Sequence, residues 1–360
     1  MASDEARGVK APLQRPGDGL CLITGASGFI GGYVAERLRR EGRPVRCLVR
    51  PSSDTSLLER LDVELACGDL RSAGSLVRAV QGCRYVVHCG ALVSDWATVG
   101  EIRRINVAGT RDLLEASLAA SVQRFVHLST TDVYGYPGGQ AVDETHLPKR
   151  FRNWYAQTKL EAEDEVRRVQ ETGALELVIV RPATVYGPRS EEVVGEMAAA
   201  ICAGHMLLIN RGRSVAGLTY VENVVDATIL ALGDDEAPGQ AFNVTDGLAV
   251  TWRQFLDDLA DGLGCRRPRW SLPYGLANGL ALSLEHAYRL LRRTTRLSAP
   301  PLLSRQAVQV LGTDQGFSNR KARTVLGWEP RVAYAAGLEA TLAWVREEHL
   351  AKIAHGRSDQ

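Results

Sequence analysis

The chain has 360 residues and a mass of 39.2 kDa, so we expect about two structural units with a large core. Hydrophobic residues form 45% of it and charged residues 24%, a balance that excludes a largely disordered, collagen-like or polytopic membrane chain. The net charge of +1 gives no overall attraction to nucleic acid, so we expect no nucleic-acid partner.

The seven cysteines contain no Cys-x-x-Cys pair, and several of them lie in apolar runs. This pattern predicts buried, reduced thiols rather than a disulfide framework. The first residues carry acidic side chains and no apolar run, so we expect neither a signal peptide nor an N-terminal membrane anchor. Together these features predict a cytoplasmic protein.

Short apolar runs alternate with stretches of helical periodicity in the first half of the chain. Strands are predicted at 20–24, 45–49, 63–67, 85–89, 125–129 and 177–180. Helical spacing runs from Phe29 to Leu38 and recurs near 72–81, 98–120 and 154–172. Because such an alternation requires crossover connections, it predicts an α/β fold: a Rossmann-type, doubly wound parallel sheet covered on both faces.

The second half of the chain is less regular and mostly helical. Helices are predicted near 189–204, 221–233, 251–263, 274–292 and 333–347, and a short strand at 241–244. We therefore predict a dinucleotide-binding domain from residues 20–185 and 217–247 and a smaller, mostly helical C-terminal substrate domain from 186–216 and 248–350. Residues 1–19 are predicted to form a flexible tail and 351–360 a second tail.

A glycine cluster follows the first predicted strand and opens the first helix. Gly25, Gly28 and Gly31 have the spacing G-x-x-G-x-x-G. Glycines at this place let the backbone turn sharply and approach a pyrophosphate, whose charge the helix N-terminus stabilises. A tight turn without a ligand is the alternative, but the strand-turn-helix setting favours a dinucleotide.

The residue type after the second strand bears on the choice of cofactor. NAD-specific sites usually place an acid there for the ribose 2′-hydroxyl, whereas this chain has Arg50, followed by Ser52 and Ser53. A guanidinium attracts a 2′-phosphate in fork geometry, which favours NADP(H) over NAD(H). The alternative is a solvated surface arginine, with NAD(H) as the cofactor.

Tyr155 and Lys159 open a predicted helix with the spacing Y-x-x-x-K. Four residues of separation put both side chains on one helical face, so we expect the ammonium to lie near the phenol. Such a cation lowers the pKa of a tyrosine toward the range useful for proton transfer. The spacing alone is common, and its weight comes from its place after a strand that ends in Ser129-Thr130-Thr131.

These segments together resemble the extended short-chain dehydrogenase/reductase family, with its epimerase/dehydratase-like members, over nearly all of residues 20–347. Within that family the chain is most similar to the 3β-hydroxysteroid dehydrogenase/isomerase-like subgroup, which includes sterol-4-carboxylate 3-dehydrogenases. Further matching segments, in chain order, are Gly68-Asp69-Leu70, His88 to Ala91, Asn106 to Thr110, Arg181-Pro182, Val185 to Pro188, Thr219 to Val225, Ala241 to Thr245, Leu272 to Tyr274, Phe317 to Arg323 and Leu326 to Pro330.

The resemblance implies a role for individual residues. Tyr155 would be the catalytic acid/base, Lys159 would also hold the nicotinamide ribose, and Thr130 would orient the substrate carbonyl. Asn106 would be structural or catalytic. The other positions expected along the cofactor are Gly25, Ser27, Gly28, Phe29, Ile30, Gly31, Arg50, Asp69, Leu70, Ala91 and Pro182.

One departure from the family pattern bears on the substrate. Nucleotide-sugar enzymes of the family usually carry Arg-Asp before the Tyr-Val element, and this chain has Ala216-Gly217. Without that guanidinium a diphosphate loses a charge-assisted partner. We therefore expect alcohol/ketone oxidoreduction of an apolar, sterol-like or keto-acyl substrate. A nucleotide-sugar epimerase or reductase is one alternative, and a cofactor-bound sensor or scaffold without turnover is another.

An uncharged, leucine-rich segment begins at Leu272 and is followed by Arg289, Arg292, Arg293 and Arg296. It is too short to cross a bilayer. A core or substrate-roof helix is the favoured interpretation, and peripheral contact of residues 272–296 with an anionic membrane is the alternative. A homodimer is also expected as an option. The seven histidines show no H-x-x-x-H spacing, so no metal site is predicted.

Overall fold

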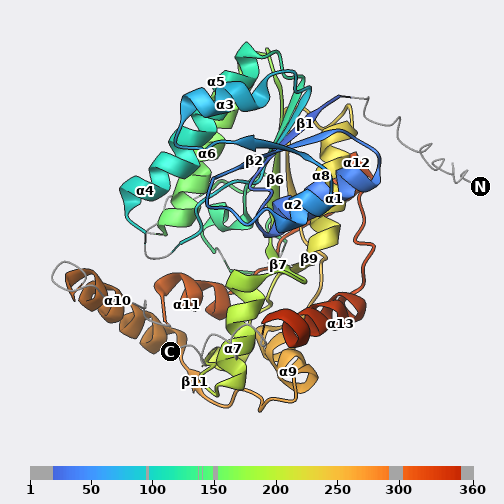
Figure 1. Cartoon of the computed structure of the whole chain (residues 1–360). Coiled ribbons are helices and arrows are strands. Elements are labelled where there is room, and N and C mark those ends of the chain that lie inside the picture. The colour runs from blue at the N-terminus through green and yellow to red at the C-terminus, as the bar shows by residue number, and fades with distance from the viewer. Residues whose placement is uncertain are drawn as a thin grey trace, which may run out of the picture.

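The computed structural model describes residues 19–94, 97–136, 138–139, 141–148, 153–291 and 303–349, and for 289–291 and 348–349 it describes the backbone only. The chain forms two lobes, an upper one built on a sheet and a lower, mostly helical one (Figure 1). Of the two predicted tails, residues 1–18 and 351–360 lie outside the described residues.

Seven strands form the central sheet of the upper lobe, in the order β10-β6-β5-β4-β1-β2-β3. Every neighbouring pair is parallel. This confirms the predicted doubly wound Rossmann-type sheet, whose strand order reverses between β1 and β4. The strands are β1 Cys21–Thr24, β2 Val45–Val49, β3 Glu64–Cys67, β4 Tyr85–His88, β5 Arg124–Leu128, β6 Glu176–Pro182 and β10 Ala241–Val244.

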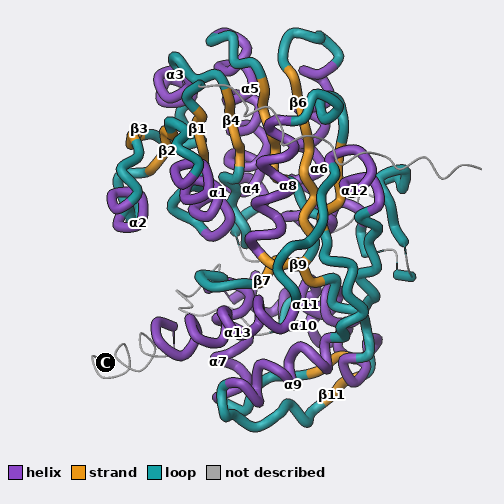
Figure 2. The backbone as a smooth tube through the Cα atoms, turned by 90° about the vertical axis from the view of Figure 1, so that its right-hand side faces the viewer, coloured by secondary structure: helices purple, strands orange, loops and turns teal. Residues whose placement is uncertain are grey.

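Helices cover both faces of this sheet because alternate strand residues point to opposite sides and nearly all of them are apolar. Ile23 packs with α1, α2, α8 and α12 on one face, whereas Leu22 packs with α3, α5 and α6 on the other (Figures 1 and 2). The first group is α1 Phe29–Arg40, α2 Ser56–Arg60, α8 Val221–Gly233 and α12 Arg320–Leu326; the second is α3 Ala73–Val80, α5 Gly109–Ala119 and α6 Trp154–Gln170.

The single helix predicted at 98–120 is observed as three consecutive helical segments. They are α4 Val99–Arg103, the π-helical turn η1 Arg104–Ala108, and α5. A capping box starts α4, in which the Thr98 hydroxyl accepts from the Glu101 amide and the Glu101 carboxylate accepts from the Thr98 amide. The π-turn carries the buried side chain of Asn106.

The lower lobe contains most of the remaining helices around a core of large side chains, among them Trp252, Phe255 and Tyr186. Two short parallel pairs, β7 with β9 and β8 with β11, accompany them. The elements are β7 Thr184–Tyr186, α7 Glu196–Cys202, β8 Leu208–Ile209, β9 Leu218–Tyr220, α9 Trp252–Gly262, β11 Ser271–Leu272, α10 Tyr274–Leu291, α11 Arg305–Gly312 and α13 Tyr334–Trp344, with the turns η2 Thr131–Tyr134, η3 Glu191–Gly195, η4 Asn210–Gly212 and η5 Val345–His349.

One domain boundary differs from the predicted one. Residues near 320–328 were assigned to the substrate domain, but α12 and Trp328 pack on the central sheet. The Trp328 indole is 1% exposed and donates to the Asn223 carbonyl of α8 at 2.9 Å. Helical spacing marks an apolar face without saying which lobe that face covers, so the sequence alone gave no sign of this return.

The cysteines correct a second prediction. Cys202 at the end of α7 and Cys265 after α9 form a disulfide between residues 63 positions apart, with Cα atoms 5.2 Å from each other. Cys67 is an exposed free thiol, and the other four are free, three of them buried. Burial raises the pKa of Cys47 to about 12 and of Cys83 to about 11. Only the packing of α7 against α9 brings the bonded pair together.

Within the described part of the chain, no helix combines the length and the apolar character needed to cross a membrane. Helix α10 nevertheless exposes Leu276, Leu280, Leu282 and Leu284, while Ala277 and Ala281 face the lobe. The predicted core helix is therefore only partly covered. Membrane contact through 272–296 stays a prediction, because residues 292–296 and the Arg289 side chain lie outside the described residues.

Candidate active site and cofactor cleft

The glycine loop lies where β1 meets α1, next to the point at which the strand order reverses. Gly25 has a φ of +70°, and a Cβ there would lie 2.8 Å from the Gly90 backbone. A Cβ on Gly31 would overlap the Gly25 carbonyl. Both positions therefore require glycine, because the loop after β4 leaves no room for a side chain at Gly25 and the backbone of Gly25 and Ala26 leaves none at Gly31.

This loop fits the pyrophosphate of a dinucleotide. Ser27 and Gly28 are exposed, and α1 begins at Phe29 with no side-chain cap on its first amides. Those uncapped N–H groups and the helix dipole attract an anion at the crevice where ligands of such sheets bind. Ile30 and Phe29 are partly buried and pack into the core beneath the loop.

The ends of β2 and β3 place Arg50 near Asp69. Arg50 is exposed, and its charge contributes to lowering the pKa of the Asp69 carboxyl. The main cause of that lowered pKa is Arg71, whose guanidinium donates two bonds to Asp69 at 3.0 and 2.6 Å. Leu70, next to Asp69, lies against Gly90 and Gly109 and lines the same edge.

Tyr155 stands in the first turn of α6, which Asn153 caps by accepting from the Ala156 amide at 3.1 Å. Desolvation by the surrounding protein raises the pKa of Tyr155 well above its usual value, and the charges of Asp132 and Glu192 raise it further. The lowered pKa predicted from the Tyr155-Lys159 spacing is therefore absent in this structure.

Lys159 does not lower the pKa of Tyr155 because of where its ammonium lies. The side chain is 3% exposed. Its ammonium donates to the Leu128 carbonyl at the end of β5, at 2.5 Å. Burial lowers the pKa of Lys159 to about 8, against the opposing attraction of Glu163. The Lys159 ammonium therefore loses its proton at a lower pH than an exposed lysine does. It is held by β5, the strand that leads into the Ser129-Thr130-Thr131 segment.

The side chains of Thr130 and Asn106 differ in how many hydrogen bonds they make within the protein. The Thr130 oxygen accepts from the Asp132 amide at 3.2 Å, which leaves its O–H free to donate. The Asn106 amide is bonded to both backbone groups of Leu92, at 2.7 and 3.1 Å, and to Thr158 at 3.2 Å. This arrangement favours the structural role for Asn106, since it ties the loop after Ala91 to α6.

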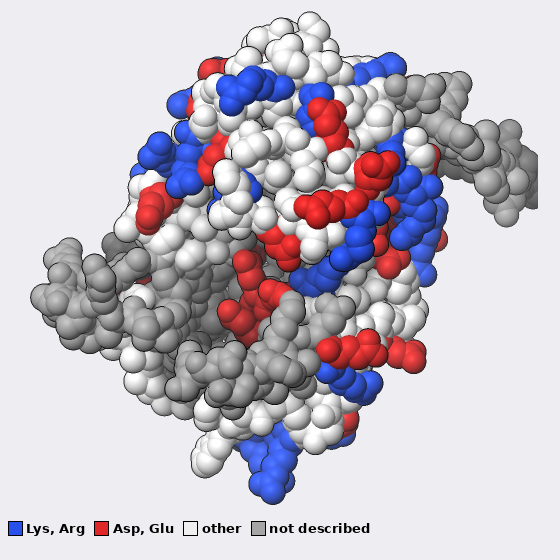
Figure 3. All heavy atoms as spheres, viewed as in Figure 1, with Lys and Arg blue, Asp and Glu red and all other residues white. Residues whose placement is uncertain are grey.

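Two acidic residues near Tyr155 have no role predicted from the sequence. Asp132 follows Thr130, and Glu192 lies in η3, where its pKa is raised by desolvation and by the nearby Glu196 and Glu191. In Figure 3 acidic side chains gather near the middle of the face shown, over η3 and the start of α7. Asp132 and Glu192 therefore place negative charge near the Tyr155 hydroxyl.

Two buried histidines behind Lys159 were also missed. His88 is hydrogen-bonded to Thr24 at 2.7 Å and to Thr110 at 2.9 Å, while both ring nitrogens of the fully buried His127 have no hydrogen-bond partner. Burial lowers the pKa of His88 to about 3 and that of His127 well below its usual range. Both rings are neutral at physiological pH.

The Ala216-Gly217 pair is not open to the cleft. Ala216 is fully buried, and a Cβ on Gly217 would lie 2.7 Å from the Gln315 carbonyl oxygen. A side chain at position 217 would have to displace residue 315, and one at position 216 would lie in the core. Pro182, at the end of β6, is buried and pairs with Val244 of β10. Among the described residues, no group of three or more His, Cys, Asp or Glu is placed to hold a metal ion.

Comparison with known proteins gives a consistent pattern. A model of the NAD dependent epimerase/dehydratase family matches residues 21–245. The 4-hydroxy-2-methyl-3-oxo-4-farnesyl-3,4-dihydroquinoline-1-oxide ketoreductase of Stigmatella aurantiaca is 34% identical over 323 residues, which cover 89% of this chain and 94% of that protein. The 3 beta-hydroxysteroid dehydrogenase/Delta 5→4-isomerase of Mycobacterium tuberculosis is 30% identical over 343 residues, or 88% of this chain and 90% of its own.

Solved structures share the fold. MoeE5, solved in complex with UDP-glucose and NAD, superposes with a TM-score of 0.70 at 26% identity, covering 91% of this chain and 99% of MoeE5. These relatives include one named ketoreductase, one named hydroxysteroid dehydrogenase and one solved with UDP-glucose. Shared ancestry therefore gives the fold and cofactor type, and the substrate has to be argued from the cleft.

Proposed function

Because the chain belongs to the NAD dependent epimerase/dehydratase family of extended short-chain dehydrogenases/reductases, we propose that it interconverts a secondary alcohol and a ketone on an apolar substrate with NADP(H). Membership makes it an NAD(P)-dependent oxidoreductase, with relatives named ketoreductase and 3β-hydroxysteroid dehydrogenase. The substrate class and the choice of NADP(H) are the proposal.

Tyr155, Thr130 and Lys159 carry the chemistry in this proposal. When bound, the nicotinamide supplies or accepts a hydride. Thr130 donates a hydrogen bond to the substrate oxygen, and the Tyr155 hydroxyl gives that oxygen a proton during reduction and takes it back during oxidation. The raised pKa of Tyr155 keeps its phenol protonated, which suits the reducing direction. In this proposal Lys159 holds the nicotinamide ribose, as its resemblance to the family implies.

The exposed Arg50 supports the preference for NADP(H). Its guanidinium stands at the end of β2, where an acid would repel a 2′-phosphate. A phosphate placed there gains charge-assisted hydrogen bonds to a planar, permanently charged group. NAD(H) stays the alternative cofactor, and relatives of the same fold were solved with NAD.

The observation that carries the substrate class is the negative charge of two described side chains near Tyr155. Asp132 and Glu192 both act electrostatically on the Tyr155 hydroxyl, and the positions of Ala216 and Gly217 are buried. A diphosphate brought to this cleft would meet carboxylates and no guanidinium from residues 216–217, so it would carry an unfavourable desolvated charge. An uncharged sterol or keto-acyl chain avoids this repulsion and gains about 25 cal/mol per Å² of apolar area buried.

The melting temperature of the NADP-bound protein, measured with different ligands, tests this proposal directly. Sterols and 3-keto acyl compounds are compared with UDP-glucose and dTDP-glucose, and NADPH oxidation is followed with the same ketones. We expect stabilisation and turnover with the apolar compounds. Stabilisation by a nucleotide sugar alone would replace the proposal by the epimerase or reductase alternative, and no hydride transfer over a broad carbonyl panel would favour a cofactor-bound sensor.

A further inference from the structure

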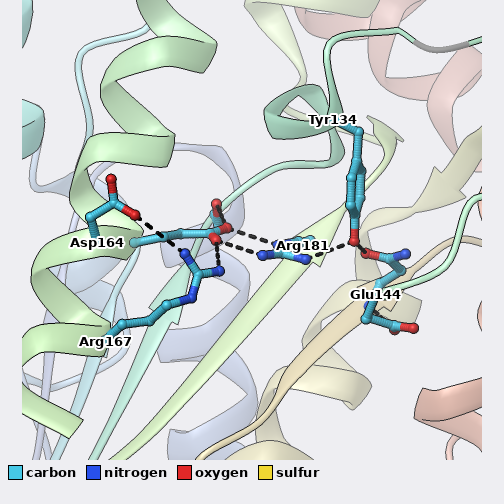
Figure 4. A network of polar contacts seen from close by, with 8 residues as sticks. Tyr134, Glu144, Asp164, Arg167 and Arg181 are labelled. Carbon is cyan, nitrogen blue, oxygen red and sulfur yellow. Dashed lines mark hydrogen bonds and ion pairs between the residues drawn. The ribbon is translucent and has the colours of Figure 1, made fainter. Parts of the chain in front are cut away.

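A cluster of buried charges lies behind Tyr155 and Lys159. Glu163, one helical turn after Lys159, is fully buried and receives two hydrogen bonds from Arg181 of β6, at 2.8 and 2.6 Å (Figure 4). The Ser129 hydroxyl donates to the same carboxylate at 2.5 Å, and Arg167 donates at 2.6 Å. Glu163 therefore joins the catalytic helix to the ends of two strands.

The cluster continues on the far side of Arg181. This guanidinium donates to the Tyr134 oxygen at 2.7 Å, and Tyr134 donates to Asn243 of β10 at 2.9 Å. The backbone N–H of Asn243 donates to the Glu144 carboxylate at 2.6 Å. In the sequence Thr130 lies between the two anchored residues, Ser129 and Tyr134, so the network fixes the segment that presents its hydroxyl.

A charged pair is not needed merely to fill this space. Desolvating two charges is costly, and a buried ion pair often stabilises a fold no better than well-packed apolar residues do. Burial acts to raise the pKa of Glu163, but the hydrogen bonds and charges of Arg181 and Arg167 outweigh it and lower that pKa. The structure thus keeps a carboxylate ionised in a place where burial opposes it.

The effect of the Glu163 charge follows from the groups that act electrostatically on Lys159. They are Glu163 on the same helix, Cys89 and His88 from β4 and its loop, and His127 of β5. Cys89 and both histidines are neutral near pH 7, since their pKa values are shifted away from it by burial. Of these four, Glu163 alone carries a charge that stabilises the ammonium.

We propose that Glu163, held by Arg181, is a positioning residue of the reaction, whose carboxylate keeps the buried Lys159 protonated and anchors the strand end that presents Thr130. The inference rests on the proposed function only in taking Lys159 and Thr130 to act in catalysis. It predicts that removing the charge of Glu163 changes the titration of Lys159, which a merely structural residue would not do.

The test is the titration of Lys159 in cofactor-free protein, followed by NMR on samples with ¹³C-labelled lysine and assigned with Lys159→Arg. In Glu163→Gln we expect the pKa of Lys159 to fall by about one unit, since an opposite charge is lost from a buried site. Glu165→Gln is the matched control, because Glu165 is on the same helix and pairs with Arg168 at the surface at 3.0 Å. It should leave the titration unchanged.

The pH dependence of turnover gives a second readout. Lys159 must be protonated to act, so a lower pKa makes the protein lose activity at lower pH, and the alkaline limb of kcat should move down by the same unit. The conservative variant Glu163→Asp keeps the negative charge, so the Lys159 pKa should fall less in it than in Glu163→Gln. An unchanged Lys159 titration in Glu163→Gln would overturn the inference, even if activity fell.

A double variant covers the case in which Glu163→Gln folds poorly because Arg181 is left buried without its partner. Glu163→Gln with Arg181→Met removes both charges, and we expect it to fold and to show the same lowered Lys159 pKa. A wild-type pKa in this variant would contradict the proposal. If Lys159 titrates as expected while the wild type turns over no carbonyl compound, the proposed function fails and the electrostatic role of Glu163 stands.

Discussion

The upper and lower lobes hold their functional surfaces in different ways. In the upper lobe, the glycine loop, Lys159 and Thr130 are fixed by backbone contacts and by a buried polar network. In the lower lobe, short helices are joined by a disulfide, and α10 presents leucines to solvent. Cofactor binding and proton transfer require one fixed geometry of the upper lobe. The substrate-binding surface of the lower lobe can differ between related proteins as long as its helices keep an apolar core.

The largest expected effect comes from the proton donor of the upper lobe. Tyr155→Phe removes only the hydroxyl, so kcat should fall at least about 100-fold while the affinity for NADP(H) stays nearly unchanged. Steady-state kinetics and a cofactor titration by fluorescence measure the two quantities. A variant that retains more than about a tenth of the wild-type rate would remove Tyr155 from the mechanism.

The lower lobe should depend on its disulfide. Cys202→Ala opens a loop of 63 residues and should reduce the free energy of unfolding by about 2–4 kcal/mol under oxidising conditions. Urea unfolding measured with and without reductant tests this, because reductant should bring the wild type to the level of the variant. Cys67→Ala, at an exposed free thiol, is the control. Equal stability of all three proteins would contradict a stabilising bond.

The choice of cofactor depends on Arg50, at the edge of the upper lobe, in this proposal. Arg50→Asp replaces attraction for a 2′-phosphate by repulsion, so the ratio of NADP to NAD affinity should fall by about tenfold to a hundredfold. Arg60→Asp, at another exposed arginine at the end of α2, should leave the ratio unchanged. Tighter binding of NAD by the unmodified protein would make Arg50 a surface residue only.

The smallest effect is a dependence of stability on pH that belongs to the upper lobe. The pKa of His88 is about 3 in the folded chain, whereas an unfolded histidine titrates near 6.5. Between these values the unfolded chain binds the additional proton, so folding stability falls as pH decreases below 6.5, by about 1 kcal/mol per pH unit for each such histidine.

Urea unfolding at pH 7.5 and 5.5 measures this slope. His127→Leu removes a second buried histidine whose pKa is lowered and whose ring nitrogens have no hydrogen-bond partner, so the slope should decrease. His205→Asn, at an exposed position, should leave it unchanged. A wild-type slope in His127→Leu would show that this ring is not neutral in the folded chain.

The sequence determined the parts of the protein that follow from local spacing. The alternation of apolar runs and helical periodicity gave the parallel sheet, because a strand buried on both faces must be continuously apolar. The glycine spacing gave the loop between β1 and α1, since only glycine meets its φ and its close contacts. The Tyr155-Lys159 spacing gave one helical face, but not the direction in which each side chain points.

Tertiary structure decided what depends on residues distant in sequence. The Cys202–Cys265 bond, the return of α12 to the sheet and the pairing of Glu163 with Arg181 all join segments whose spacing carries no signal. The pKa of Tyr155 is raised because desolvation, Asp132 and Glu192 act on it, while Lys159 is turned to the Leu128 carbonyl. Burial and charge are properties of assembled neighbours, so no local pattern could reveal them.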